Sequence, residues 1–373
     1  MKMQKCLLLI GVFFLVVLSI DAQKISFIGF FNTTGENIQK GMISEERIVL
    51  NEIQTIARSL ETYGYDFDGH AIYDGLNCTK SNVMKAINEL QVDPEDIVIF
   101  YYGGHGGRAL NDDDPFPQMC LTEGPSNYVP ATLVRNMILR KKPRLTVVLT
   151  GCCNSEGSEI SIKSVYAQGQ NYTVQKEKNH EYYKKLFIDN TGWVQMTSSR
   201  AKEYSYTGDG GSFFCHVFWT VMNGVGEGKI DADWNILCKN VQEYVSSIAI
   251  HAKNGIAYQH PDYRVNTSCG GVSNIKKDTK NGDKNSSISD AINSLLDKSK
   301  SIDSRLDMIP SIMSNHFSSV QLVRTLARNM TTVVDHEDPN TFLMRIAMSP
   351  YIEQVNIVEQ NGSIMSVHEI RSR

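Results

Sequence analysis

Short runs of β-branched and aromatic residues alternate along this chain with longer stretches in which apolar residues recur every three or four positions. A short, fully apolar run is typical of a buried strand, and the longer period is typical of a helix with one buried face. The predicted strands cover residues 24–30, 70–73, 97–102, 145–150 and 193–197, and the predicted helices cover residues 44–63, 83–90, 133–138, 213–222 and 234–248. Such alternation predicts βαβ units, and therefore an α/β fold with a mostly parallel central sheet.

The pattern changes towards the C-terminus. Residues 276–287 consist largely of Lys, Asp, Asn, Gly and Ser, a composition typical of a linker. Beyond them, residues 288–296 and 312–326 have helical periodicity, and Asn361-Gly362 between two apolar runs predicts a closing β-hairpin. A small α+β extension is therefore expected after the main domain.

The predicted organisation is a main domain over residues 23–270, a linker over 271–287 and the extension over 288–373. The extension contains no recognised motif. We interpret it as a cap on the sheet, and an inhibitory, substrate-recruiting or surface-docking role stays open.

The first twenty-two residues are predicted to be a signal peptide. Lys2 and Lys5 precede an apolar run at residues 6–17, and Ala22 is a small residue suited to cleavage. The run is short for a membrane span, although an uncleaved anchor is the alternative. We expect a secreted protein, extracellular or periplasmic, with no membrane span after signal removal.

Composition narrows the class further. The chain has 373 residues, is 41% hydrophobic and carries a formal charge of −4, with Lys+Arg 37 against Asp+Glu 41. The sequence has no stripe of basic residues, so we expect no nucleic acid as a partner. Of the eight cysteines, Cys6 belongs to the signal segment, and the remaining seven are compatible with one free reactive thiol, with disulfides among the others left open. No Cys or His residues have zinc-ligand spacing.

Two predicted strands end in residues that carry chemistry. The strand at 97–102 is followed by glycines around His105, and the strand at 145–150 is followed by Gly151, Cys152 and Cys153. Neighbouring parallel strands deliver the loops at their carboxyl ends side by side, where open α/β sheets bind ligands. A thiol and an imidazole together suit nucleophilic acyl transfer, and the N–H groups of Gly106 and Cys153 could form an oxyanion hole. A loop histidine or a buried cysteine alone would be weak evidence, but both at equivalent strand ends favour catalysis.

These residues resemble the caspase-like cysteine peptidases, in particular the metacaspase and bacterial caspase-homologue branch. The stretches Tyr102-Gly103-Gly104-His105-Gly106 and Gly151-Cys152-Cys153-Asn154-Ser155 are similar to that family's Tyr-Ser-Gly-His-Gly and Asp-x-Cys-His-Ser-Gly blocks. Weaker similarities at residues 49–52, 210–214 and 258–261 extend the resemblance over about residues 24–270. It implies a caspase-like three-layer sandwich, His105 as general base, Cys153 rather than Cys152 as nucleophile, a protein or peptide substrate and no organic cofactor.

The departures from the family pattern concern specificity. Gly151 stands where the family usually has an Asp that holds a basic substrate side chain, and Gly103 replaces a Ser of the same pocket. Glu52 is a candidate for the missing carboxylate, and a helix-surface glutamate is the alternative interpretation. The candidate substrate-binding residues are thus Glu52, Gly103 and Gly151, with Arg-type, Lys-type or altered specificity left open.

Two further segments carry hypotheses. Asp112, Asp113 and Asp114 suggest calcium, which related enzymes often require, but three adjacent carboxylates cannot easily face one ion, and a solvated turn is favoured. The polar, lysine-rich residues 158–185 lie where caspase-like enzymes are divided, which suggests self-cleavage after one of the lysines, with ordinary disorder as the alternative.

The sequence therefore predicts a secreted cysteine endopeptidase. A legumain-like peptidase is one alternative, although its His usually follows an acidic residue. An inactive caspase homologue that acts as a binding module is the other, because of Gly151. The oligomeric state stays open.

Overall fold

The computed structural model describes residues 22–35, 37–110, 112–122, 128–156, 179–252, 255–269, 287–300, 304–305, 308–326, 333–349, 352–361 and 363–371. Nearly all of the predicted signal peptide and of the predicted linker lies outside these residues. No helix among the described residues is both long enough and apolar enough to cross a bilayer.

A six-stranded sheet, counted over the described residues, forms the centre of the fold, in the order β13-β8-β7-β3-β1-β2. Its strands are β1 (Gln23–Phe31), β2 (Tyr65–Asp74), β3 (Ile97–Gly103), β7 (Leu145–Gly151), β8 (Asn190–Thr197) and β13 (Asp262–Cys269). Neighbouring strands are parallel except β13, which runs antiparallel to β8. Strands β3 and β7 are buried at every residue, as expected for the centre of a sheet that is covered on both faces.

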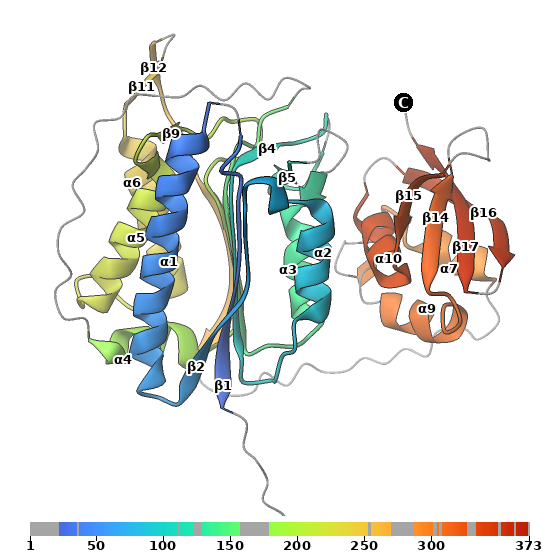
Figure 1. The fold of residues 1–373 in the computed structure, drawn as a ribbon, viewed down its shortest axis with the longest axis horizontal. Coiled ribbons are helices and arrows are strands. Elements are labelled where there is room, and N and C mark those ends of the chain that lie inside the picture. Colours follow the sequence, from blue (N-terminus) through green and yellow to red (C-terminus); the bar gives the residue numbers. More distant parts are fainter. Residues whose placement is uncertain are drawn as a thin grey trace, which may run out of the picture.

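Helices cover both faces of this sheet and complete three layers (Figure 1). One layer contains α1 (Gln39–Glu61), α5 (Phe213–Gly226) and α6 (Trp234–Ser247), and the other contains α2 (Lys80–Glu89) and α3 (Ala131–Leu139). Each layer forms its own hydrophobic core against one face of the sheet. The predicted α/β fold with a mostly parallel sheet and three layers is confirmed.

Helix α1 shows how the sequence sets this packing. Its apolar residues Val49, Ile53, Ile56 and Leu60 are all buried on one face, as their spacing predicts. The same face also buries two carboxyl groups, those of Glu45 and Glu52. Buried carboxyl groups are costly unless they are paired, so each of them needs a local explanation.

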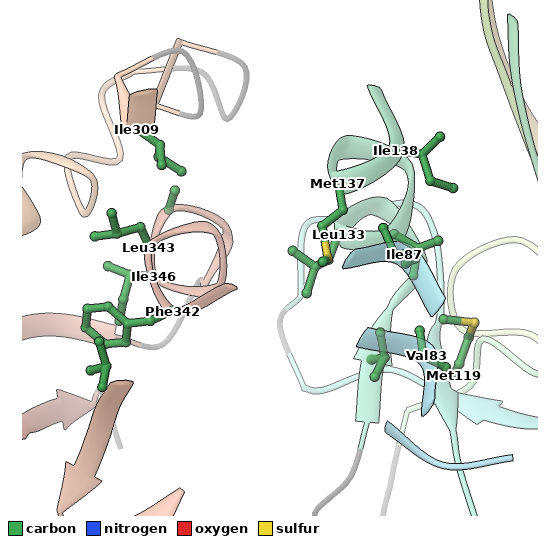
Figure 2. Close-up of a cluster of buried hydrophobic side chains, with 14 of the residues drawn as sticks. Val83, Ile87, Met119, Leu133, Met137, Ile138, Ile309, Phe342, Leu343 and Ile346 are labelled. Atoms are coloured by element: carbon green, nitrogen blue, oxygen red, sulfur yellow. The ribbon is translucent and has the colours of Figure 1, made fainter. Parts of the chain in front are cut away.

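A small antiparallel sheet of short strands supports the loop after β3. It consists of β4 (His105–Gly107), β5 (Gln118–Cys120) and β6 (Tyr128–Pro130). Met119 of β5 is completely buried in the core beneath α2 and α3, where Val83 and Ile87 also lie (Figure 2). The His105 loop is thereby fastened to the hydrophobic core and is not a free surface loop.

The C-terminal part forms a separate four-stranded sheet in the order β15-β14-β17-β16. Its elements are α7 (Ile288–Ser294), α9 (Ile309–His316), β14 (Leu322–Leu326), β15 (Val333–Glu337), α10 (Pro339–Met348), β16 (Ile352–Asn361) and β17 (Ile364–Arg371). The predicted closing hairpin is confirmed, because β16 and β17 pair in antiparallel fashion. The helix predicted over residues 312–326 is wrong in its second half, where β14 pairs with both β15 and β17.

An ion cluster lies where the C-terminal part meets the main domain. Arg345 of α10 bonds the carboxylates of Glu337 (Nε to Oε2, 2.8 Å) and Glu369 (Nη2 to Oε1, 2.6 Å), both of which are buried. Lys80 Nζ, at the start of α2, lies 3.8 Å from Glu337 Oε1. The C-terminal part therefore contacts the helical layer that supports the His105 loop, while its exact boundaries stay predictions.

Candidate active site

Strands β3 and β7 deliver their carboxyl-terminal loops side by side. The two strands are paired in register from Ile97 opposite Leu145 to Gly103 opposite Gly151. Beyond the strands, Gly104 N donates to Gly151 O (3.1 Å) and Arg108 N donates to Ser155 O (3.0 Å). Along the chain, His105 lies between Gly104 and Arg108, and Cys153 lies between Gly151 and Ser155. The structure thus brings together the two loops that carry the predicted imidazole and thiol.

His105 is held by its backbone and by a close glycine. It stands opposite Cys120 in the ladder of β4 and β5, and the buried Tyr102 hydroxyl donates to His105 O (2.6 Å). A Cβ atom at Gly35, in the loop after β1, would lie 2.9 Å from His105 Nε2. The imidazole therefore rests against bare backbone, which fixes the ring while leaving it half-buried.

Gly106 packs directly against the cysteine loop. A Cβ atom there would lie 2.5 Å from Cys152 Sγ and 2.7 Å from Cys153 O, closer than real Cβ atoms approach. Only glycine fits without displacing the loop. The main chains of Gly106 and Cys153, the two predicted oxyanion donors, are thus in direct contact.

The Cys153 thiol is covered by the loop that follows β8. Its side chain is only 3% exposed. Ser205 N donates to Cys153 Sγ (3.3 Å), and the thiol in turn donates to Ser205 O (3.6 Å). Burial raises the pKa of Cys153 to about 11, and the Ser205 N–H offsets only part of that effect. Cys153 is consequently a protonated thiol at neutral pH, and attack requires a base to remove its proton.

Alkylation of Cys153 in the substrate-free protein is expected to accelerate with pH up to about 11, because the thiolate reacts far faster than the thiol. A cysteine with an ordinary pKa would level off near about 8.5. Mass spectrometry after timed iodoacetamide pulses measures the rate for the Cys153 peptide, and the exposed Cys269 serves as a reference in the same sample. A Cys153 rate that levels off near a pH of about 8.5 would contradict the expectation.

The structure adds a carboxyl group that the sequence interpretation missed. Glu45 of α1 is completely buried, and its Oε1 accepts a hydrogen bond from Tyr101 Oη (2.6 Å) while its Oε2 accepts one from Ser212 N (2.9 Å). A Cβ atom at Gly103 or Gly151 would lie 2.9 or 2.8 Å from Glu45 Oε1. The carboxyl group therefore occupies the space beside Gly103, which is two residues before His105, and beside Gly151, which is two residues before Cys153.

Burial raises the pKa of Glu45, and the hydrogen bonds from Ser212 and Tyr101 oppose that shift. A signal for Glu45 was present in the sequence, since an acidic residue on the apolar face of a helix requires a reason. Glu52 gave the same signal two helical turns later. The structure does not bring Glu52 to the loops: it is buried between α1 and α5, where Asn223 Nδ2 donates to its Oε1 (3.1 Å).

The acidic residues after the His105 loop hold that loop's own turn together. Asp112 accepts from Asp114 N (Oδ1, 3.0 Å) and Gln118 Nε2 (Oδ2, 3.1 Å), and Asp114 Oδ1 accepts from Phe116 N (3.0 Å) and from Thr132 (3.0 Å). Among the residues that the structure describes, no group of three or more His, Cys, Asp or Glu side chains is arranged to hold a metal ion. The acidic triplet does not fit a calcium site.

The hypothesis of self-cleavage concerns residues that are mostly outside the described chain. Of the predicted loop at 158–185, the structure describes only the end, which is helical in α4 (His180–Tyr183) and continues in the π-helical turn η2 (Lys184–Ile188). Lys184 and Lys185 are therefore part of regular structure. The seven cysteines that the structure describes are all free thiols, and Cys269 is the exposed one.

A thiol and an imidazole on adjoining loops at the carboxyl ends of parallel strands, over glycine backbone, define a site of the cysteine-peptidase class. The comparison with protein families agrees, because residues 41–270, more than half of the chain, match the caspase domain. The chain belongs to this caspase-domain family of cysteine peptidases. No curated protein matches the chain.

Proposed function

We propose that this protein is a secreted cysteine endopeptidase of the metacaspase and bacterial caspase-homologue branch that cleaves after basic residues. The observation that carries the proposal is the double connection of the His105 and Cys153 loops, from Gly104 to Gly151 and from Arg108 to Ser155. Secretion is supported by the basic and then apolar residues at the start of the chain.

In the proposed reaction, the His105 imidazole takes the proton of the Cys153 thiol as the sulfur attacks the peptide carbonyl. The N–H groups of Gly106 and Cys153 stabilise the negative charge on the carbonyl oxygen. The imidazolium then returns its proton to the leaving amine. A water molecule, activated by the same imidazole, hydrolyses the thioester and restores the thiol. Substrate main chain has to displace Ser205 from the sulfur before attack.

Preference for basic residues is supported by Glu45. Its Oε1 lies where side chains at Gly103 and Gly151 would point, the positions at which the resembling branch carries a Ser and an Asp. In this proposal, a basic substrate side chain passes the two glycines to reach the Glu45 carboxyl group, which fills the space that side chains at these positions would take. A Lys or Arg side chain bound there would pair with an otherwise costly buried carboxylate, which gives the enzyme a reason to keep it.

A catalytically inactive binding module is the second candidate. The observation that favours it is the covered thiol, which is 3% exposed and has a pKa of about 11. An inactive protein would keep the Ser205 contact permanently, whereas an enzyme must open it.

Cleavage-site profiling on the mature protein tests the proposal. Peptides that differ only in Arg, Lys, Asn or Asp before the scissile bond are incubated with wild-type protein and with Cys153→Ala. We expect cleavage after Arg or Lys by the wild type only. Cleavage after Asn would indicate the legumain-like alternative. No cleavage together with no labelling of Cys153 by a thiol-reactive peptide probe would indicate the inactive module.

A further inference from the structure

The two catalytic loops are tied together on both sides of the reactive side chains. On the strand side, the tie is regular sheet pairing that ends at Gly103 and Gly151. On the far side, it is formed around Arg108, three residues after His105, and Asn154, the residue after Cys153. Arg108 Nη1 donates to Asn154 Oδ1 (3.2 Å), next to the backbone bond from Arg108 to Ser155. We refer to this pair as the Arg108–Asn154 clamp.

Asn154 uses both ends of its side chain and both of its backbone groups. Its Nδ2 donates to Pro115 O (2.8 Å) and Ser199 O (3.2 Å), while Oδ1 accepts from Arg108. Its N donates to Glu203 O (2.9 Å), and its O accepts from Lys202 N (2.8 Å). The side chain is completely buried. One residue thus joins the cysteine loop to the His105 loop, to the turn beyond it and to the loop that covers the thiol.

Arg108 is equally committed. Its side chain is buried, and Nη2 donates to Asp114 O (2.7 Å) and also to Asp112 O. These bonds go to a side-chain amide and to backbone carbonyls in fixed directions, which a planar guanidinium can satisfy and an ammonium cannot. The geometry needs the fork of an arginine, and positive charge alone does not replace it.

We propose that Arg108 and Asn154 are positioning residues of the dyad: the clamp sets the separation and orientation of the His105 imidazole relative to the Cys153 thiol. Neither residue touches the reacting atoms. The inference rests on the proposed function, because it assumes that His105 acts on Cys153. The sheet fixes one side of the gap between the two loops, and on the other side the clamp and the neighbouring backbone bond from Arg108 to Ser155 hold the loops together. Small displacements of one loop relative to the other are costly in catalysis.

The test measures how strongly His105 assists Cys153, with iodoacetamide as the probe and therefore without any assumption about substrate. The alkylation rate of Cys153 at pH 7.5 is compared between wild type and His105→Ala, and then between Asn154→Leu and the double variant. We expect His105→Ala to slow alkylation by about tenfold or more in the wild-type background, as a lost general base should. In the Asn154→Leu background, we expect a change of less than about twofold, because the assistance is already lost.

Graded variants separate positioning from folding. Asn154→Asp keeps the acceptor for Arg108 and loses the two amide donors, so it should retain part of the assistance, and Arg108→Lys should retain little. The matched control is Asn190→Leu. Asn190 is the first residue of β8, whereas Ser199, a partner of Asn154, lies beyond the last residue of that strand. Asn190 is also buried and also donates to two carbonyls, those of Lys185 (2.9 Å) and Leu186 (3.2 Å). This control should lower the melting temperature and leave the assistance unchanged.

Three outcomes bear on the clamp. Loss of assistance in the Asn154 and Arg108 variants but not in Asn190→Leu supports it. An unchanged effect of His105→Ala in the Asn154 variants overturns it while leaving the dyad intact. No effect of His105→Ala in the otherwise wild-type protein overturns the proposed function, and the clamp with it. Where Asn154→Leu does not fold, the effect of His105→Ala on Cys153 alkylation is measured in the Asn154→Asp and Arg108→Lys backgrounds, and the same three outcomes apply.

Discussion

Replacement of Cys153 by alanine is expected to abolish peptide hydrolysis, and replacement of His105 by alanine to lower kcat/KM by roughly 10⁴-fold or more. That loss corresponds to about 5 kcal/mol of transition-state stabilisation. The physical reason is the protonated state of the nucleophile. With a pKa of about 11, the Cys153 thiol is a poor nucleophile at neutral pH unless an imidazole removes its proton during attack. The measurement is steady-state cleavage of the best basic peptide found by profiling.

The matched control for this prediction is Cys152→Ala. Cys152 lies in the hydrophobic core with Tyr102 and Met119, and burial raises the pKa of its thiol well above the usual value. It is a packing residue whose removal leaves a small void, so turnover should fall by no more than about tenfold while stability falls by about 1–3 kcal/mol. Activity that survives Cys153→Ala but disappears in Cys152→Ala would reverse the assignment of the nucleophile.

The place of this site could be predicted because its two candidate catalytic residues follow uninterrupted apolar strands. Buried parallel strands have an unmistakable composition, and their carboxyl ends meet at one edge of the sheet. The local pattern therefore placed His105 and the two adjacent cysteines at this edge, while the choice of Cys153 over Cys152 came from the family resemblance. The same reasoning located α1, α2, α3, α5 and α6 to within a few residues at most boundaries.

The rest depended on contacts between residues far apart in the sequence. Ser205 covers the thiol, and Ser212 donates to the Glu45 carboxyl group from 167 positions further along the chain. Strand β13 was missed because it is an edge strand with a largely exposed, polar sequence, and strand β14 was taken for a helix because its pairing partner β17 lies beyond α10. Long-range pairing decides such segments, and a short window of sequence does not contain it.

The choice between Glu45 and Glu52 shows the same limit for function. Both are buried acidic residues on the same face of α1, separated by two helical turns of about 5 Å each. Periodicity cannot distinguish them. Only the tertiary structure shows that Glu45 lies beside Gly103 and Gly151, while Glu52 is bonded to Asn223.

Glu45→Gln is expected to lower kcat/KM for Arg and Lys peptides by roughly thirtyfold or more, corresponding to at least about 2 kcal/mol for the loss of a buried charge partner. Most of the loss should be in KM, because the carboxylate holds the substrate side chain and does not take part in bond making. The matched control is Glu52→Gln, which removes an equally buried carboxyl group from the same helix. A loss of basic preference in Glu52→Gln with none in Glu45→Gln would assign specificity to the other glutamate.

The pH dependence supplies an independent signature of the same carboxyl group. Burial raises the pKa of Glu45 above 4.5, so this group is protonated in the folded protein at pH values where an ordinary glutamate is ionised. KM for basic peptides should therefore rise as the pH falls through that raised pKa, and Glu45→Gln should remove this limb. The stability of the free protein changes in the opposite direction with pH. The unfolded chain releases the proton of Glu45 more readily than the folded protein does, so the contribution of Glu45 to folding is present at low pH. That contribution is lost as the pH rises from 4.5 towards the raised pKa. A bound basic side chain would compensate the buried charge, so a basic inhibitor should stabilise the wild type more above the raised pKa of Glu45 than below it, and should stabilise Glu45→Gln equally on both sides.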